Sequence, residues 1–280
     1  MIPKSFITEW QNQYPWPLQN QVEQDLIISR VLVEIFSDPH LASSLAFRGG
    51  TALYKLFLTP APRYSEDIDL VQIDAEPIGK TLDHIRKILD PLLGTPQRKL
   101  GRGLVTITYR FPSEQSPLIN LRLKLEINTR EHVPLLGYLS KDFSVNSSWF
   151  SGKAIITTYQ LEELMGTKLR ALFQRNKGRD LFDFWYVMNN KELSIPKTLE
   201  VFQYYLKQQN LNISRAQFEK NLFEKQSSEL FLNDTSPLLK TEIMPQWDSD
   251  KALKTVRNQV ISLLPGEAWK GEPSELIKSP

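Results

Sequence analysis

The sequence predicts an α+β fold, in which strands and helices mix over residues 1–150 and helices alone follow over residues 151–280. Residues 118–128, LINLRLKLEIN, alternate strictly between apolar and polar side chains, which is the period of a half-buried strand. Residues 159–175, YQLEELMGTKLRALFQR, instead repeat apolar side chains with the period of a helix. Because helical periods dominate after about Gly152, we expect a domain boundary near residue 150.

The front half predicts a helix over residues 21–37, a short strand at residues 45–47 and a helix over residues 51–58 that two prolines terminate. We then expect a strand, a helix, a basic turn-rich connection and two strands, at residues 68–73, 77–89, 94–103, 104–111 and 118–128. The back half predicts helices that include residues 159–175, 179–189 and 250–264.

The composition is that of a protein that folds in water, with 41% hydrophobic and 24% charged residues among 280. No apolar run reaches about 18 residues and the N-terminus lacks a signal-peptide pattern, so we expect a cytoplasmic protein without a membrane segment. The chain has no cysteine and three histidines, which excludes disulfides, thiolate catalysis and histidine-rich metal cages. A metal ion would therefore be held by carboxylates, which favours Mg²⁺ or Mn²⁺.

Two aspartates, Asp67 and Asp69, flank Ile68 at the start of the predicted strand. Residues i and i+2 of a strand share a face about 6–7 Å apart, so both acids and Ser65 lie on one side while Ile68 faces the core. Like charges this close repel each other, and a divalent cation between them removes that penalty. A pair of solvated acids on an exposed sheet face is the alternative.

The turn Gly49-Gly50-Thr51 joins the strand at residues 45–47 to the next helix. Glycine amides at a helix N-terminus allow close approach of a triphosphate, although a simple tight turn has the same sequence. No G-x-x-x-x-G-K-[ST] and no G-x-G-x-x-G pattern is present, which excludes the P-loop and dinucleotide-binding interpretations. On the polar face of strand 118–128, Glu126 is placed to supply a third carboxylate, or to pair with Lys124 or Arg122 in solvent.

Residues 168–179 contain five basic residues and no acidic one, although the net charge of the chain is only +2. Lys168 falls inside the apolar stripe of its predicted helix and needs an anion there. In the next helix Asp180 and Asp183 lie among apolar residues, and buried acids need a basic partner. An ion-pair network that only ties the two helices together remains open.

Five segments in this order resemble the AbiEii/AbiGii-type toxin family of nucleotidyltransferase-like proteins: GGTALYKL, RYSEDIDL, LKLEINTRE, YQLEELMGTKLRAL and RNKGRDLFDFWYV. The resemblance covers roughly residues 45–190. It implies a polymerase-β-like nucleotidyltransferase core with a helical C-terminal domain that completes the active-site cleft. It also implies the toxin half of a bacterial toxin–antitoxin or phage-defence module, with a cognate antitoxin as a partner. Some members of the family transfer nucleotides to the 3′ end of tRNA.

The resemblance also implies roles for individual residues, with the metal at Asp67, Asp69 and Glu126 and further catalytic roles for Lys168 and Asp183. Asp180 lies near Asp183, and the family does not decide between these two acids. The residues expected to bind the nucleotide are Gly49, Gly50, Thr51, Arg63, Ser65 and Lys168. From the basic charge of the stretch rather than from the resemblance, the residues expected to bind RNA are Arg170, Arg175, Lys177 and Arg179. Many relatives carry Gly-Ser where this chain has Gly50-Thr51 or Gly49-Gly50, so the backbone contact is expected more firmly than the hydroxyl contact.

The expected function is metal-dependent transfer of a nucleotide from an NTP to an RNA acceptor, which the resemblance suggests is the tRNA 3′ end. Two other classes of function remain open. A D-x-D glycosyltransferase also uses paired aspartates to hold a metal, and a catalytically silent nucleotide- or RNA-binding module could use the same fold. The sequence does not say which NTP or which RNA is used.

Overall fold

The computed structural model describes residues 2–114 and 118–271, and the chain divides into two compact units. The first unit comprises Met1–Gln160 together with Leu238–Ile243, and the second comprises Leu161–Pro237 and the chain from Met244 onward. The division therefore falls after Gln160 rather than at residue 150. Of the predicted C-terminal domain, residues 272–280 lie outside the described residues.

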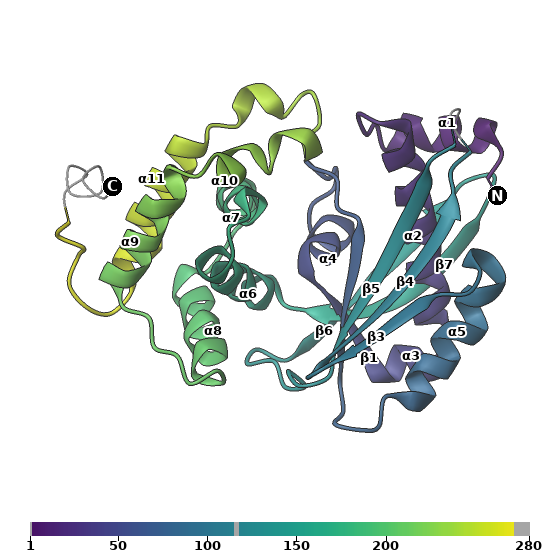
Figure 1. Cartoon of the computed structure of the whole chain (residues 1–280), viewed down its shortest axis with the longest axis horizontal. Coiled ribbons are helices and arrows are strands. Elements are labelled where there is room, and N and C mark those ends of the chain that lie inside the picture. The colour runs from purple at the N-terminus through teal and green to yellow at the C-terminus, as the bar shows by residue number, and fades with distance from the viewer. Residues whose placement is uncertain (1, 115–117, 272–280) are drawn as a thin grey trace. The chain divides into compact units, whose positions relative to one another are not determined.

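Within the described residues, a seven-stranded sheet forms the centre of the first unit, with the order β3-β4-β5-β2-β1-β7-β6 (Figure 1). Its strands are β1 (Leu45–Arg48), β2 (Asp67–Gln72), β3 (Gln97–Gly101), β4 (Leu104–Pro112), β5 (Asn120–Asn128), β6 (Tyr138–Asn146) and β7 (Ser151–Tyr159). The pairs β2–β5 and β1–β7 are parallel, and the other neighbouring pairs are antiparallel. This mixed sheet confirms the predicted α+β class.

Two strands of the sheet occupy segments for which the sequence predicted something else. Residues 97–101, expected inside a turn-rich connection, form the exposed strand β3, which pairs along its whole length with β4. Residues 151–159, expected to open the helical half, form β7, which lies between β1 and β6. The β-branched run in β7 suits a strand, and its partners β1 and β6 are distant enough in sequence that local patterns did not reveal the pairing.

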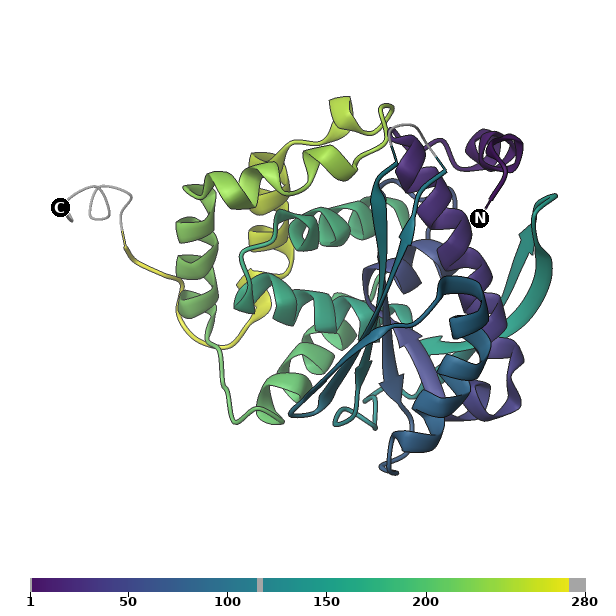
Figure 2. The same ribbon diagram turned by 45° about the vertical axis from the view of Figure 1, so that its right-hand side comes forward.

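The first unit has one long central helix, α2 (Gln19–Ser37), which the sequence predicted over residues 21–37. Its side chains are buried around most of its circumference, because it contacts β5, β6 and β7 as well as neighbouring helices. Figures 1 and 2 both show α2 and α5 running beside the sheet. The other helices of this unit are α1 (Lys4–Gln13), α3 (Pro39–Ser44), α4 (Gly49–Leu56) and α5 (Gly79–Leu93).

The second unit is helical, as the sequence predicted for the C-terminal part of the fold. Its α-helices are α6 (Leu161–Gln174), α7 (Gly178–Asn190), α8 (Ile195–Lys207), α9 (Arg215–Gln226), α10 (Glu229–Asn233) and α11 (Ser249–Gln259). Short 3₁₀ turns follow at Ser236–Leu238, Met244–Gln246 and Ile261–Leu263. Helices α6 and α8 approach closely at Gly166, where an added Cβ would lie 2.6 Å from the Cβ of Val201. Gly166 therefore sets the spacing of this helix pair.

A short segment from the later part of the chain, Leu238–Ile243, belongs to the first unit. The amide of Tyr64 donates to the carbonyl of Leu238 at 2.8 Å, and the amide of Lys240 donates to the carbonyl of Pro62 at 3.1 Å. A β-bridge between Arg63 and Leu239 lies between these two bonds. The loop that leads into β2 is thus held by residues that follow it by most of the length of the chain.

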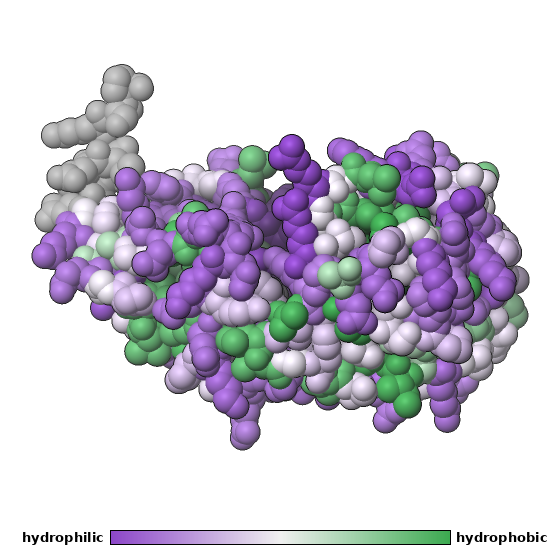
Figure 3. Space-filling model, turned by 90° about the horizontal axis from the view of Figure 1, so that it is seen from below, coloured by the Kyte–Doolittle hydropathy of each residue, from purple (hydrophilic) through white to green (hydrophobic). Residues whose placement is uncertain are grey.

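None of the helices in residues 2–114 and 118–271 is both long enough and apolar enough to span a membrane. The face drawn in Figure 3 is mostly hydrophilic, with hydrophobic residues gathered in small separate areas.

Candidate active site

The two aspartates of β2 lie on the accessible face of the sheet. Asp67 and Asp69 are partly exposed, whereas Ile68 and Leu70 between and after them are buried at 0% and 1%. The parallel register places Asp67 opposite Lys124 and Asp69 opposite Glu126 on β5. The antiparallel register on the other side places Asp69 opposite Arg48 on β1. Neighbouring strands therefore bring five charged residues to one face of the sheet.

The glycine turn lies directly against one of these acids. Gly49 begins α4 with a φ of +81°, and an added Cβ would come within 2.8 Å of the carboxyl carbon of Asp69. A residue with a side chain would be strained by the backbone angle and would also displace the Asp69 carboxylate. The first turn of α4 thus brings its backbone amides close to a carboxylate of β2, an arrangement in which a phosphate and a metal ion can share one site.

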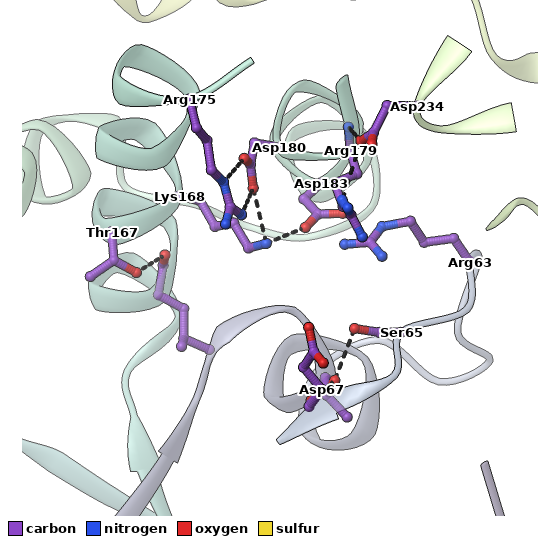
Figure 4. A network of polar contacts seen from close by, with 12 residues as sticks. Arg63, Ser65, Asp67, Thr167, Lys168, Arg175, Arg179, Asp180, Asp183 and Asp234 are labelled. Atoms are coloured by element: carbon purple, nitrogen blue, oxygen red, sulfur yellow. Dashed lines mark hydrogen bonds and ion pairs between the residues drawn. The ribbon is translucent and has the colours of Figure 1, made fainter. Parts of the chain in front are cut away.

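Thr51, expected to contact the nucleotide, is 1% exposed and turned into the protein. Its hydroxyl lies 2.8 Å from the Ser65 hydroxyl and donates to the backbone carbonyl of Asp67. Figure 4 shows Ser65 and Asp67 side by side at the start of β2. In this arrangement the Thr51 side chain positions the segment from Ser65 to Asp67, which leaves the backbone of the turn as the part available to a ligand.

Arg63, expected to neutralise phosphate charge, is also buried, at 1% exposed. Its Nη1 donates to the carbonyl of Tyr64 at 2.8 Å, and its guanidinium lies over the ring of Tyr54, 4.6 Å from the ring centroid. These contacts hold the side chain within the loop that precedes β2. A phosphate contact by Arg63 stays a prediction.

Arg48 at the end of β1 forms an ion pair with Glu131 at 2.5 Å. Burial opposes the charge on Arg48, but the attraction of Tyr159, Glu131 and Asp69 outweighs it and raises the pKa of the guanidinium above its ordinary value. Arg48 is therefore a cation beside Asp69, and its role was not predicted from the sequence. The position of Arg48 directly before the glycine turn is the sequence feature that could have indicated a role in the site.

Glu126 forms an ion pair with Lys124, as one of the two sequence-based interpretations predicted. The Nζ of Lys124 lies 3.2 Å from Oε2 of Glu126 and also 3.2 Å from Oδ2 of Asp67. Burial opposes the charge on Lys124, but these two carboxylates outweigh it and raise the pKa of the ammonium. The contact of Lys124 with Asp67 was not predicted, because it depends on the parallel pairing of β2 with β5.

In the second unit, Lys168 on α6 forms ion pairs with both candidate acids of α7. Its Nζ lies 2.7 Å from Oδ2 of Asp183 and 3.2 Å from Oδ1 of Asp180, whose side chains are both 0% exposed. Arg175 adds two hydrogen bonds to Asp180, at 2.6 and 2.8 Å (Figure 4). Burial opposes ionisation of Asp180, but Lys168 and Arg175 outweigh it and lower the pKa of this carboxyl.

This ion-pair network ties α6 to α7, as one of the two sequence-based interpretations of Lys168 expected. Binding of phosphate by Lys168 stays a prediction.

The basic residues expected to bind RNA have partners inside the same unit. Lys177 and Arg179 pair with Asp234 at 3.5 and 3.2 Å, and Arg170 lies over the ring of Tyr205, 4.9 Å from its centroid. Lys177 and Arg175 remain about half exposed. Binding of RNA by these residues stays a prediction.

Comparison with known proteins decides the family. The model of the nucleotidyl transferase AbiEii toxin family, of type IV toxin–antitoxin systems, matches residues 30–255. The chain belongs to the AbiEii family. It is accordingly a nucleotidyltransferase of the toxin class, and the predicted resemblance is confirmed. A comparison with curated proteins found no match.

Solved structures similar to this AbiEii protein share its fold at low sequence identity. The nucleotidyltransferase toxin MenT4 of Mycobacterium tuberculosis is 16% identical, with a TM-score of 0.69, over 95% of this chain and 91% of that one. A protein from H. pylori assigned as a nucleotidyltransferase is 18% identical, with a TM-score of 0.53, over 87% of this chain and 95% of that one. These similarities confirm the nucleotidyltransferase fold.

The carboxylates of Asp67, Asp69 and Glu126 are the expected ligands of a divalent metal ion in this AbiEii protein. Asp67 and Asp69 lie two residues apart on one accessible face of β2, and the Asp69 carboxylate occupies the space beside Gly49. Mg²⁺ is commonly held by one or two carboxylates together with substrate phosphates, so these two aspartates fit. Within residues 2–114 and 118–271, no three acidic or histidine side chains are grouped so that they could hold a metal. Glu126, the expected third ligand, is instead paired with Lys124.

Proposed function

We propose that this AbiEii protein is a metal-dependent nucleotidyltransferase that transfers a nucleotide from an NTP to an RNA acceptor, with the tRNA 3′ end as the first acceptor to test. The observation that carries this proposal is the contact between the glycine turn and β2, where Gly49 packs on the Asp69 carboxylate. One short stretch of backbone therefore presents amides for phosphate oxygens and carboxylates for a divalent cation.

In the proposed reaction, the RNA 3′-oxygen forms a bond to the α-phosphorus of the NTP while the bond from that phosphorus to the bridging oxygen breaks, and pyrophosphate leaves. The proton of the hydroxyl passes to a carboxylate of the site, for which Glu126 is the sequence-based candidate. The backbone amides at the start of α4 bind phosphate oxygens, and Thr51 keeps Ser65 and Asp67 in place. Mg²⁺ or Mn²⁺ on Asp67 and Asp69 would supply charge stabilisation for the nucleophile and the leaving group.

The test is RNA labelling by the purified protein with Mg²⁺, total tRNA and each of the four α-labelled NTPs in turn. Asp67→Asn and Asp69→Asn keep the shape of the side chain but remove its charge, so we expect labelling to fall about a hundred-fold or more. Asp83→Asn is the matched control, because Asp83 is an exposed acid of the same unit, on α5. Labelling that persists in Asp69→Asn contradicts the metal assignment.

Other outcomes of this assay separate the remaining classes of function. Tight NTP binding without a labelled product, with either Mg²⁺ or Mn²⁺, supports a silent binding module. Hydrolysis of nucleotide sugars in place of RNA labelling supports a glycosyltransferase. Lys168→Met tests the predicted phosphate contact. Its folding must be checked by circular dichroism, since it also leaves Asp180 and Asp183 without their shared partner.

A further inference from the structure

A lysine ammonium occupies a position between two carboxylates of the candidate site. Lys124 reaches from β5 to Asp67 on β2 and to Glu126 on its own strand, with both nitrogen–oxygen distances at 3.2 Å. All three side chains are between about a fifth and a third exposed, so the cluster can be reached from solvent. A cation that bridges carboxylates of adjacent strands is in the place that a divalent ion would take on Asp67.

Of the cations on this face, Lys124 is the one that can exchange for another. Lys124 contacts the carboxylates of Asp67 and Glu126, and Arg48 lies opposite Asp69 on the neighbouring strand. Arg48 cannot be the cation that leaves, because it is largely buried and bonded to Glu131. Lys124 is a flexible, partly exposed side chain and can release Asp67 while it keeps Glu126.

We propose that Lys124 is a positioning residue that neutralises Asp67 in the metal-free protein and moves onto Glu126 alone when Asp67 takes up a divalent cation. This inference rests on the proposed function, but it assigns Glu126 to anchor Lys124, so that the hydroxyl proton passes to another carboxylate of the site or to solvent. The ammonium and a metal ion cannot both contact Oδ2 of Asp67 closely, because like charges a few ångströms apart repel. Lys124 therefore lowers the affinity of the site for a free metal ion, so that the ion binds well only when it arrives with the nucleotide phosphates.

The experiment is a Mn²⁺ titration of the purified full chain without nucleotide, in which free Mn²⁺ is measured by electron paramagnetic resonance. Because Lys124 makes two partly exposed ion pairs, we expect Lys124→Met to bind Mn²⁺ about ten-fold more tightly than the wild type. Lys124→Arg keeps the positive charge and should bind as the wild type does. Lys87→Met is the matched control, because Lys87 is exposed on α5 and makes no ion pair among the described residues.

A second measurement is the thermal midpoint of unfolding of the metal-free protein, which does not depend on catalytic activity. In EDTA, Lys124→Met should lower the thermal midpoint, because Asp67 and Glu126 lose their shared cation. Adding Asp67→Asn to this variant should restore part of the loss. Added Mn²⁺ should then raise the midpoint of Lys124→Met more than that of the wild type.

The inference is overturned if Lys124→Met binds Mn²⁺ no more tightly than the wild type, or if neither protein binds Mn²⁺ without nucleotide. The proposed function fails separately, if no RNA is labelled under any condition. Tighter Mn²⁺ binding by Lys124→Met in a protein that labels no RNA supports the role of Lys124 and contradicts only the proposed reaction.

Discussion

At the scale of single residues, the absence of a side chain at Gly49 decides where the Asp69 carboxylate can lie. Gly49 has a left-handed backbone, and the space that its Cβ would fill is occupied by the Asp69 carboxylate. Glycine is therefore favoured at position 49 for two reasons, the positive φ and the lack of space for a side chain. Either requirement alone would favour glycine, and together they tie the start of α4 to the acid pair.

Gly49→Ala should therefore destabilise the protein and displace Asp69. We expect a loss of roughly 1–2 kcal/mol in the free energy of unfolding from the backbone angle alone, measured by urea titration. RNA labelling should fall further than this loss explains, because the carboxylate moves. Gly79→Ala is the control, since nothing lies within 4 Å of the Cβ it would add. Wild-type labelling by Gly49→Ala would show that the position of Asp69 does not matter.

At the scale of elements, a lysine of α9 binds the C-terminal end of α6. Lys225 on α9 donates from its Nζ to the carbonyls of Leu172 and Phe173 in the last turn of α6, the second at 3.0 Å. The last carbonyls of a helix have no partner within it, so the lysine satisfies them from a neighbouring helix. Burial nevertheless lowers the pKa of Lys225 from 10.5 to about 8.

This shift predicts how stability changes with pH. The folded pKa of Lys225 lies below the unfolded value, so between about pH 8 and pH 10.5 the unfolded chain binds a proton that the folded chain does not. The contribution of Lys225 to the free energy of unfolding should therefore rise with pH in this window, by about 1–2 kcal/mol between pH 8 and pH 10. Denaturant titrations at the two pH values should show a smaller rise in Lys225→Met.

The control for this pH effect lies on the same helix. Lys220 is more than half exposed and lies 3.9 Å from Glu224, so Lys220→Met should keep the wild-type rise. An equal rise in Lys225→Met and the wild type contradicts the assignment of the effect to Lys225.

Elements also show where local sequence patterns stop being informative. The strict alternation of residues 118–128 and the apolar period of residues 21–37 predicted β5 and α2 well, because each of these elements buries one or more whole faces. β3 is exposed at every residue, so it has no apolar period to detect, and only its pairing with β4 makes it a strand. β7 was missed because its partners β1 and β6 were not known from local sequence.

At the scale of the whole molecule, the chain returns to its first unit after forming most of the second. Residues 238–243 hold the loop before β2 through two backbone hydrogen bonds and a β-bridge. This loop carries Arg63 and Ser65, and it leads directly into Asp67. The arrangement of the loop before Asp67 therefore depends on a segment that lies within the family match over residues 30–255 but beyond the motifs recognised in residues 45–190.

Leu239→Ala tests this dependence in the full chain. Leu239 is 1% exposed, so we expect a loss of about 2–4 kcal/mol in the free energy of unfolding. The amide of Tyr64, bonded to Leu238, should exchange its hydrogen faster, as measured by hydrogen–deuterium exchange. Leu263→Ala, at a side chain 59% exposed, should change neither quantity. Unchanged exchange at Tyr64 in Leu239→Ala would falsify the role of the returning segment.

The sequence by itself determined the fold class and the family, and it predicted most of the residues of the candidate site. It did so because periodicity, glycine turns and short charged motifs are local properties of the chain. The tertiary structure decided which charges meet. The parallel pairing of β2 with β5 brings Lys124 to Asp67, and the packing of α6 against α7 seats Lys168 between Asp180 and Asp183. Such contacts depend on strand order and helix packing, which arise between segments far apart in the sequence.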